Sequence, residues 1–156
     1  MNEQIRLLQA EIRENLDAIA DTYTRLQTIS HREIDEETAI LLAYHLHVIY
    51  GLFENMFTRI AANFGNHVED SAQWHALLLK RMTLDIPEVR PRVIQEETFL
   101  CLDELRRFRH LFRNAYLLRF DPQRLQLLLQ DAWKLQETYP QDLNSFLQFL
   151  ESLLSA

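Results

Sequence analysis

Apolar residues recur every three or four positions through most of the chain, which is the spacing of helices that each bury one face. This stripe is clear over residues 5–26, and an almost uniformly apolar run over 38–64 predicts a central helix that is buried on several sides. Further helices are expected from about residue 70, from about 93 to 116 and after residue 121. The pattern predicts an all-α, up-and-down helical bundle of about four to six helices.

Local signals set the expected ends of these helices. Ser30 and Glu33 have the spacing of a capping box, and Asp121 followed by Pro122 is typical of an N-cap with proline in the first turn. Pro140 interrupts the last apolar stripe. We therefore predict that this segment breaks at Pro140 and continues as a separate short helix.

The composition fits a single domain spanning residues 1–156. Two glycines and four prolines are too few for a fold of many short strands and turns. No apolar run approaches the roughly 20 residues of a membrane span, and the charged N-terminal segment has no signal-peptide core, so we expect a cytoplasmic protein without membrane attachment. The single cysteine, Cys101, excludes an internal disulfide and a paired-cysteine site.

Charge is distributed unevenly along the chain. The net charge of −7 is unfavourable for a general nucleic-acid binder. Residues 106–124, however, hold six arginines and one acid, so this stretch carries +5 and the remainder −12. Arginine presents a planar fork of donors that suits phosphate. Two interpretations stay open: a phosphate-binding strip, or a solvated helix face whose counter-charges come from a neighbouring element.

Other candidates for chemistry are few. His45 and His47 are two residues apart and point in different directions on a helix, and no HExxH, Glu-x-x-His or CxxC spacing is present. We therefore expect no metal and no other cofactor, and interpret His75, beside Trp74, as a packed, hydrogen-bonded residue. Gly-rich phosphate loops and nucleophile motifs are absent from the sequence as well.

Arginine, histidine, asparagine and tyrosine come together in the motif segment 105–124, LRRFRHLFRNAYLLRFDPQR. On a helix, several of these side chains form a cationic strip with a histidine and a phenol, and Phe108 faces the opposite way into the bundle. The strip consists of Arg106, Arg109, His110, Arg113 and Tyr116.

The stretch FRHLFRNAY resembles the signature of the HEPN ribonucleases, in particular the HepT-like toxins. Their motif is an arginine, a polar residue, a few further positions and then a histidine, which is often followed one residue on by a tyrosine. Arg109 and His110 stand at the arginine and polar positions, and Tyr116 stands at the tyrosine. Asn114 stands where the family has its histidine.

The resemblance extends over residues 39–130 and includes AYHLHVIYGLFENMFTRIA, the Trp74-His75 segment, Pro91 and FDPQRL. It implies an HEPN-like helical bundle that forms a homodimer, with the motif residues of two protomers facing one cleft. It also implies a metal-independent endoribonuclease in which the ribose 2′-hydroxyl attacks the adjacent phosphate. A guanidinium can hold the phosphate oxygens while a histidine moves the proton.

Toxins of the kind that this chain resembles are commonly paired with a nucleotidyltransferase antitoxin of the MNT type, which can attach AMP to the motif tyrosine. The resemblance makes Tyr116 the acceptor. AMP at this position would fill the cleft and set negative phosphates against Arg109 and Arg113, which would exclude RNA by bulk and by charge. The implied partners are therefore RNA, either tRNA or mRNA, and a nucleotidyltransferase.

Asn114 departs from the motif, because a carboxamide cannot carry a proton. Loss of a general acid or base lowers a rate by about 10²–10⁴. Three explanations stay open: a naturally weakened or inactive relative, a toxin that has been inactivated, or a chain in which His110 moves the proton. Since the rest of the strip is intact, we favour an inactive or attenuated toxin. Asparagine is also well suited to the C-terminal end of a helix, which is compatible with this interpretation.

Two other functions stay open as alternatives. One is a non-catalytic helical module that binds RNA or a protein partner through its arginines, and the other is a structural bundle whose charges only solvate it. For the ribonuclease, the predicted catalytic residues are Arg109, Asn114 and His110. The predicted phosphate- and RNA-binding residues are Arg106 and Arg113.

Overall fold

The computed structural model describes residues 1–65, 68, 73–114 and 121–155, and over 110–114 it describes the backbone alone. Within these ranges the chain forms five helices and no strand, so the all-α prediction is confirmed. The helices are α1 (Asn2–Ser30), α2 (Glu36–Asn63), α3 (Trp74–Arg81), α4 (Glu96–Asn114) and α5 (Pro122–Leu154).

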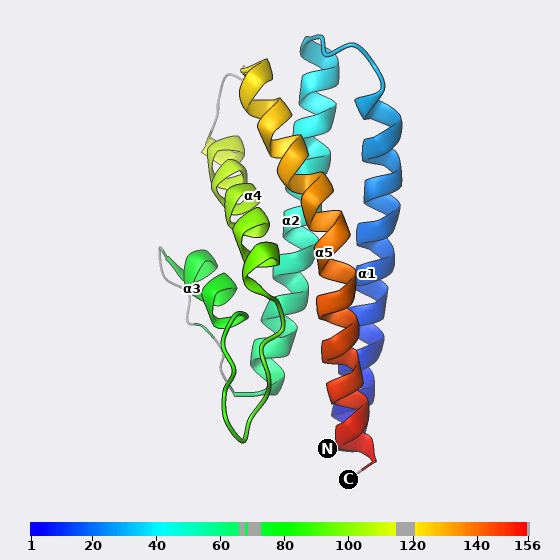
Figure 1. Cartoon of the computed structure of the whole chain (residues 1–156), viewed down its shortest axis with the longest axis vertical. Coiled ribbons are helices and arrows are strands. Elements are labelled where there is room, and N and C mark those ends of the chain that lie inside the picture. The colour runs from blue at the N-terminus through cyan, green and yellow to red at the C-terminus, as the bar shows by residue number, and fades with distance from the viewer. Residues whose placement is uncertain (66–67, 69–72, 115–120, 156) are drawn as a thin grey trace.

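The four long helices run alternately up and down, with α1 and α4 in one direction and α2 and α5 in the other (Figure 1). The short α3 lies beside α4, on the side away from α1, and both chain termini lie at the same end of the bundle. α2 contacts each of the other four helices. The central place predicted for the run over 38–64 is therefore confirmed.

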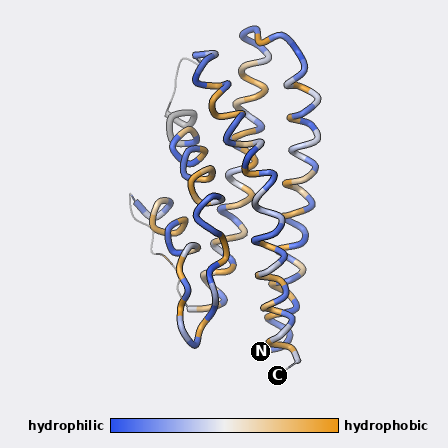
Figure 2. Tube along the Cα trace, in the orientation of Figure 1, coloured by the Kyte–Doolittle hydropathy of each residue, from blue (hydrophilic) through white to orange (hydrophobic). Residues whose placement is uncertain are grey.

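Apolar and polar segments alternate along every helix (Figure 2), and the apolar ones form a single core. Leu46 and Phe53 of α2 are completely buried in it, and each such side chain contributes roughly 1.5–3 kcal/mol. The hydroxyl of Tyr23 in α1 donates a hydrogen bond to the carbonyl oxygen of Ala132 in α5 at 2.7 Å. No helix in the described part of the chain is long and apolar enough to cross a membrane.

The sequence predicts the N-cap of α5 correctly but not the N-cap of α2. Asp121 caps α5, as expected. The predicted capping box at Ser30 is wrong, because Ser30 is the last residue of α1 and its hydroxyl donates to the carbonyl oxygen of Gln27 at 2.9 Å. The N-cap of α2 is Asp35, whose carboxylate accepts a hydrogen bond from the Thr38 N–H at 2.7 Å and whose pKa is lowered by it.

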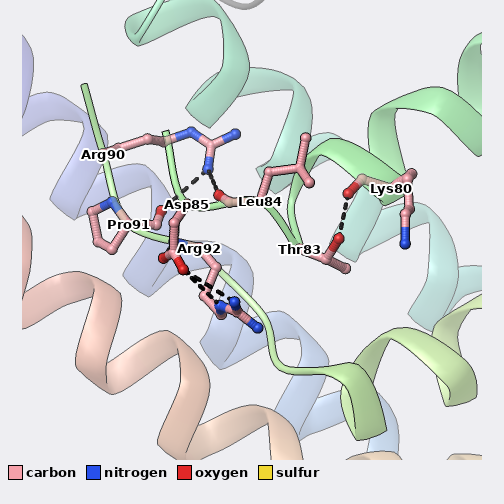
Figure 3. Close-up of polar contacts among 7 residues, drawn as sticks. All are labelled: Lys80, Thr83, Leu84, Asp85, Arg90, Pro91 and Arg92. Atoms are coloured by element: carbon pink, nitrogen blue, oxygen red, sulfur yellow. Dashed lines mark hydrogen bonds and ion pairs between the residues drawn. The ribbon is translucent and has the colours of Figure 1, made fainter. Parts of the chain in front are cut away.

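The connection between α3 and α4 is held from inside by Arg90, which is 3% exposed. Its guanidinium donates hydrogen bonds to the carbonyl oxygens of Leu84 and Pro91 at 3.2 and 3.1 Å (Figure 3). A third bond of 3.1 Å reaches the carbonyl oxygen of Arg81 at the end of α3. Arg90 thus satisfies carbonyl groups that the turn leaves without helical partners.

α4 begins at Glu96, slightly later than the predicted start near Val93. The N–H groups of Val93 and Ile94 donate to the carbonyl oxygen of Met82, at 2.8 and 3.2 Å. Both residues are also buried. Their apolar character, which suggested an early helix start, therefore reflects packing of the connection rather than helix.

The predicted break at Pro140 is wrong, because α5 continues through it to Leu154. A proline inside a helix removes one backbone hydrogen bond and costs about 3 kcal/mol. Pro140 lies on the exposed face, as does Gln136, so water can solvate the carbonyl oxygen that loses its donor. The buried stripe continues through Leu143 and Phe146, and their burial favours one helix over two.

The continuity of α5 places Asp142 against the start of α4. Its carboxylate accepts hydrogen bonds from the Gln95 N–H at 3.0 Å and from the Thr98 hydroxyl at 2.5 Å. One residue of α5 thereby supplies an acceptor at the N-terminal end of α4, where backbone donors have no partner within the helix. This contact fixes α4, which carries most of the cationic strip.

We expect Pro140→Ala to raise the free energy of unfolding by about 1–3 kcal/mol, because the carbonyl oxygen of Gln136 regains an N–H donor. Urea unfolding followed by circular dichroism measures the change. Gln136→Ala, on the same exposed face, is the control and should change stability by less than about 0.5 kcal/mol. A loss of stability in Pro140→Ala would contradict a continuous α5.

Candidate functional site

Arg109, the motif arginine, lies near the C-terminal end of α4 and turns toward α2. Its side chain is 18% exposed, and Nη1 donates to Oε1 of Glu54 at 2.6 Å. The guanidinium carbon lies 5.7 Å from the centre of the Tyr50 ring, which is within the range of a cation–π contact. Nε is buried and has no hydrogen-bond partner among the described residues. α2 therefore holds Arg109 through one ion pair and one aromatic ring.

Glu54 is the only acid between Thr38 and Phe64, and its side chain is 9% exposed. Its second oxygen, Oε2, lies 2.6 Å from Nδ1 of His75, the second residue of α3. The one carboxylate therefore joins α2 to both α3 and α4. A buried carboxylate is tolerated in a protein when its oxygens are paired in this way.

His75 is packed and hydrogen-bonded, as predicted. Its ring lies against the Trp74 ring, with centroids 3.9 Å apart and an angle of 30° between the planes. Trp74 in turn packs against the apolar core, while the His75 side chain remains 31% exposed. The imidazole is thus fixed by a hydrogen bond at one edge and by a stacked ring on one face.

Tyr50 completes the group that we call the Glu54 cluster, which consists of Tyr50, Glu54, His75 and Arg109. Burial raises the pKa of Tyr50 well above its ordinary value, and the Glu54 carboxylate raises it further. Arg106 and Arg109 oppose this shift in the pKa. The phenol therefore stays neutral at ordinary pH and contributes its ring and hydroxyl to the cluster.

The cationic strip is less charged than the sequence count indicates. Nη2 of Arg106 and Nη2 of Arg107 lie 2.9 and 3.1 Å from the carboxylate of Asp103, and Arg109 is paired with Glu54. Both acids lie outside residues 106–124: Asp103 is one turn earlier on α4, and Glu54 is on α2. The interpretation that a neighbouring element supplies counter-charge is therefore correct for Arg109.

The other predicted site residues lie on or beyond the end of α4. His110, Arg113 and Asn114 belong to the helix, and their side chains lie outside the described part of the structure. Tyr116 lies outside the described residues altogether. Phe108 is buried in the core, as the helical spacing predicts.

The described part of the chain offers no metal site, because no set of three or more His, Cys, Asp or Glu side chains there could hold a metal ion. Nδ1 of His45 is 2.7 Å from the carbonyl oxygen of Leu41 in its own helix. Cys101 is buried, and burial raises the pKa of its thiol, which makes it a poor nucleophile.

The sequence-based prediction of the site did not include Glu54, although the sequence around Glu54 contains a signal for it. A single carboxylate in an otherwise apolar, centrally buried helix needs a cationic or hydrogen-bonding partner. Its partners could not be identified from the sequence, because His75 and Arg109 are 21 and 55 residues away along the chain.

An up-and-down bundle that anchors the motif arginine to its central helix is consistent with an HEPN-like domain. The family model described as HepT-like protein matches residues 41–150, so the chain belongs to the HepT-like family. No curated protein and no solved structure gives a significant match. The matched range contains α3, α4 and the Glu54 cluster and leaves α1 outside. Membership indicates a HEPN toxin-type function and an association with toxin–antitoxin systems.

We expect Glu54→Gln to lower the free energy of unfolding by about 1–3 kcal/mol, because glutamine keeps the shape but leaves the half-buried Arg109 without an anion. Urea unfolding at neutral pH measures the difference. Glu104→Gln, at an exposed position of α4, is the control and should change stability by less than about 0.5 kcal/mol. Equal effects of the two substitutions would show that the Glu54 cluster does not hold the helices together.

Proposed function

We propose that this chain is an endoribonuclease toxin of a toxin–antitoxin pair and that it cleaves RNA without a metal ion. The ribose 2′-hydroxyl attacks the adjacent phosphorus, the 5′-oxygen leaves, and the products carry a 2′,3′-cyclic phosphate and a 5′-hydroxyl. The observation that carries this proposal is the position of Arg109, the motif arginine of a HepT-like chain, which Glu54 holds in place before any RNA binds.

In this proposal Arg109 holds the phosphate of the bond that is cleaved. A guanidinium has five N–H donors, and Glu54 engages Nη1, so donors remain for phosphate oxygens. Because Glu54 is buried and fixed, the guanidinium needs little reorganisation as negative charge develops on the phosphate. Arg106 and Arg113 extend the cationic surface to neighbouring phosphates.

Asn114 attenuates this activity, because it stands where the family has a histidine and cannot carry a proton. The expected loss is about 10²–10⁴ in rate. His110 follows Arg109 directly and is the histidine of the motif segment that remains. It is a candidate for part of the proton transfer.

The working form in this proposal is a cytoplasmic homodimer in which two motif segments face one cleft, since two copies double the positive potential there. A nucleotidyltransferase antitoxin of the MNT type neutralises it by attaching AMP to Tyr116. The added phosphate meets Arg109 and Arg113, so it competes with RNA for the same cations.

A non-catalytic module that binds RNA or a protein partner is the second candidate function. Asn114 favours this function. It removes the proton-carrying group from the motif but leaves the arginines that could bind phosphate. Such a module would bind tRNA with an affinity that falls with salt and would cleave it in no variant.

The Asn114→His substitution tests the proposed reaction. We expect it to raise cleavage of tRNA by about 10²–10⁴, with cyclic phosphate at the new 3′ ends, because an imidazole can transfer the proton that the carboxamide cannot. Gel analysis and mass spectrometry of the fragments measure the rate and the end chemistry. Asn144→His, at an exposed position of α5, is the matched control and should leave cleavage unchanged.

Two results would contradict the proposed function. If folded Asn114→His cleaves neither tRNA nor mRNA and still binds them in a salt-dependent way, the chain is a binding module. If cleavage by any form requires added divalent metal and is abolished by EDTA, the reaction is not the metal-independent one proposed.

We expect an MNT-type nucleotidyltransferase with ATP to increase the mass of the chain by one or more AMP groups and to abolish tRNA cleavage by the Asn114→His form. Tyr116→Phe should accept no AMP and stay active, because it lacks the acceptor hydroxyl. Tyr44→Phe, which removes a tyrosine that is 53% exposed, should still be modified. Intact-mass spectrometry gives the result, and modification of Tyr116→Phe would exclude Tyr116 as the acceptor.

A further inference from the structure

His75 brings a second proton-carrying group to the arginine of the proposed site. Its Nδ1 lies 2.6 Å from Oε2 of Glu54, and Nη1 of Arg109 lies 2.6 Å from Oε1 of the same carboxylate. A single carboxylate group therefore separates the imidazole from the guanidinium, although they belong to α3 and α4. His75 is far from the motif segment in sequence, so the motif alone gives it no role.

The Glu54 carboxylate determines which nitrogen of His75 carries the proton. An ionised carboxylate only accepts hydrogen bonds, so Nδ1 bears the hydrogen and Nε2 of the neutral ring is the proton acceptor. Among the described residues, none forms a hydrogen bond with Nε2. Trp74 holds the plane of the ring, and 31% of the side chain is exposed to solvent. An oriented ring with one accepting nitrogen is what a general base requires.

We infer that His75 is the general base of the ribonuclease site and that Glu54 is its positioning residue. The inference rests on the proposed function and deepens it, because it assigns proton abstraction to a residue outside the motif. Glu54 is not the base itself, since both of its oxygens are engaged and its side chain is 9% exposed.

In the chain with Asn114, water serves as the acid of this step. Nε2 of His75 takes the proton of the 2′-hydroxyl, the 2′-oxygen forms a bond to phosphorus, and the bond from phosphorus to the 5′-oxygen breaks. A water molecule protonates the leaving 5′-oxygen, and the resulting hydroxide takes the proton from the imidazolium. Arg109 holds the non-bridging oxygens throughout. A histidine at position 114 would replace the water as the acid, which divides the two proton transfers between positions 75 and 114.

The test is His75→Asn in the Asn114→His chain. Asparagine keeps an N–H donor near the place of Nδ1, so Glu54 keeps a partner, but the accepting Nε2 is lost. We expect tRNA cleavage to fall by about 10²–10⁴, with tRNA binding and the melting temperature close to those of the parent. His75→Gln is a second variant with the same expected loss, should His75→Asn fail to fold.

His45→Asn is the matched control. Nδ1 of His45 also lies 2.7 Å from an acceptor, the carbonyl oxygen of Leu41, and the residue lies on α2 several turns from Glu54. We expect cleavage by this variant to equal that of the parent. An equal loss in His45→Asn and His75→Asn would overturn the assignment, because a general effect of removing a helix-bound histidine would then explain both.

A substrate with sulfur in place of the bridging 5′-oxygen separates base from acid, because a thiolate leaves without a proton. The chain with Asn114 should cleave this substrate about as fast as the Asn114→His chain, whereas His75→Asn should remain slow on it. Recovery of His75→Asn on the sulfur substrate would overturn the role of base.

The outcomes for the two proposals are distinguishable. Cleavage by Asn114→His that His75→Asn leaves unchanged overturns the assignment of His75 and leaves the proposed function standing. Absence of cleavage from every folded form overturns the proposed function and this inference together.

Discussion

The carboxylate of Glu54 accepts hydrogen bonds from two helices that are distant from it in sequence. Its Oε2 accepts from His75 of α3, and its Oε1 accepts from Arg109 of α4. A carboxylate in an apolar environment is unfavourable unless it is paired, so the helices around it must present cations or donors at these two points. The central helix thereby sets the position of α3 and of the motif arginine at the same time. The arrangement of the candidate site therefore follows from the need to pair the buried Glu54 carboxylate.

This constraint also decides what the arginines of α4 can do. Arg109 is neutralised by Glu54, and Arg106 and Arg107 share Asp103. The local field is therefore weaker than six arginines in one stretch suggest. Recognition of phosphate then depends on orientation, because a guanidinium that is held by one nitrogen still presents its other donors in a fixed plane. In the proposed ribonuclease, the pair with Glu54 lowers the effective charge that Arg109 presents to RNA and increases the preorganisation of its guanidinium.

Much of the fold could be predicted from the sequence, because the period of apolar residues reports directly which face of a helix is buried. The central helix and the buried side of Phe108 follow from this period, and the N-cap at Asp121 follows from the adjacent pair Asp121-Pro122. The continuity of α5 could not be predicted, since a local rule for Pro140 competes with burial of Leu143 and Phe146 further along. The start of α4 at Glu96 could not be predicted for a similar reason, because Val93 and Ile94 are apolar residues that pack the connection before the helix.

The candidate site also contains one part that local sequence predicts and one part that depends on tertiary packing. Arg109 lies within a short motif, so a role for it could be predicted from its neighbours in sequence. Its partners could not be inferred, because a pairing across 21 or 55 residues depends on how three helices pack. Glu54 stands out only as the lone acid of an apolar run, and His75 only as a histidine beside a tryptophan.

The fold and the chemistry at position 114 depend on different residues. The start of α4 is fixed by Asp142 of α5, and its later part is fixed by the pair between Arg109 and Glu54. None of these contacts needs a histidine at 114, so the bundle and the placement of Arg109 tolerate asparagine there. An intact bundle is consequently no measure of activity in this chain. In the proposed ribonuclease, activity depends on which groups near Arg109 can accept and donate a proton. Among the described side chains of the Glu54 cluster, only the imidazole of His75 combines that ability with a fixed orientation and access to solvent.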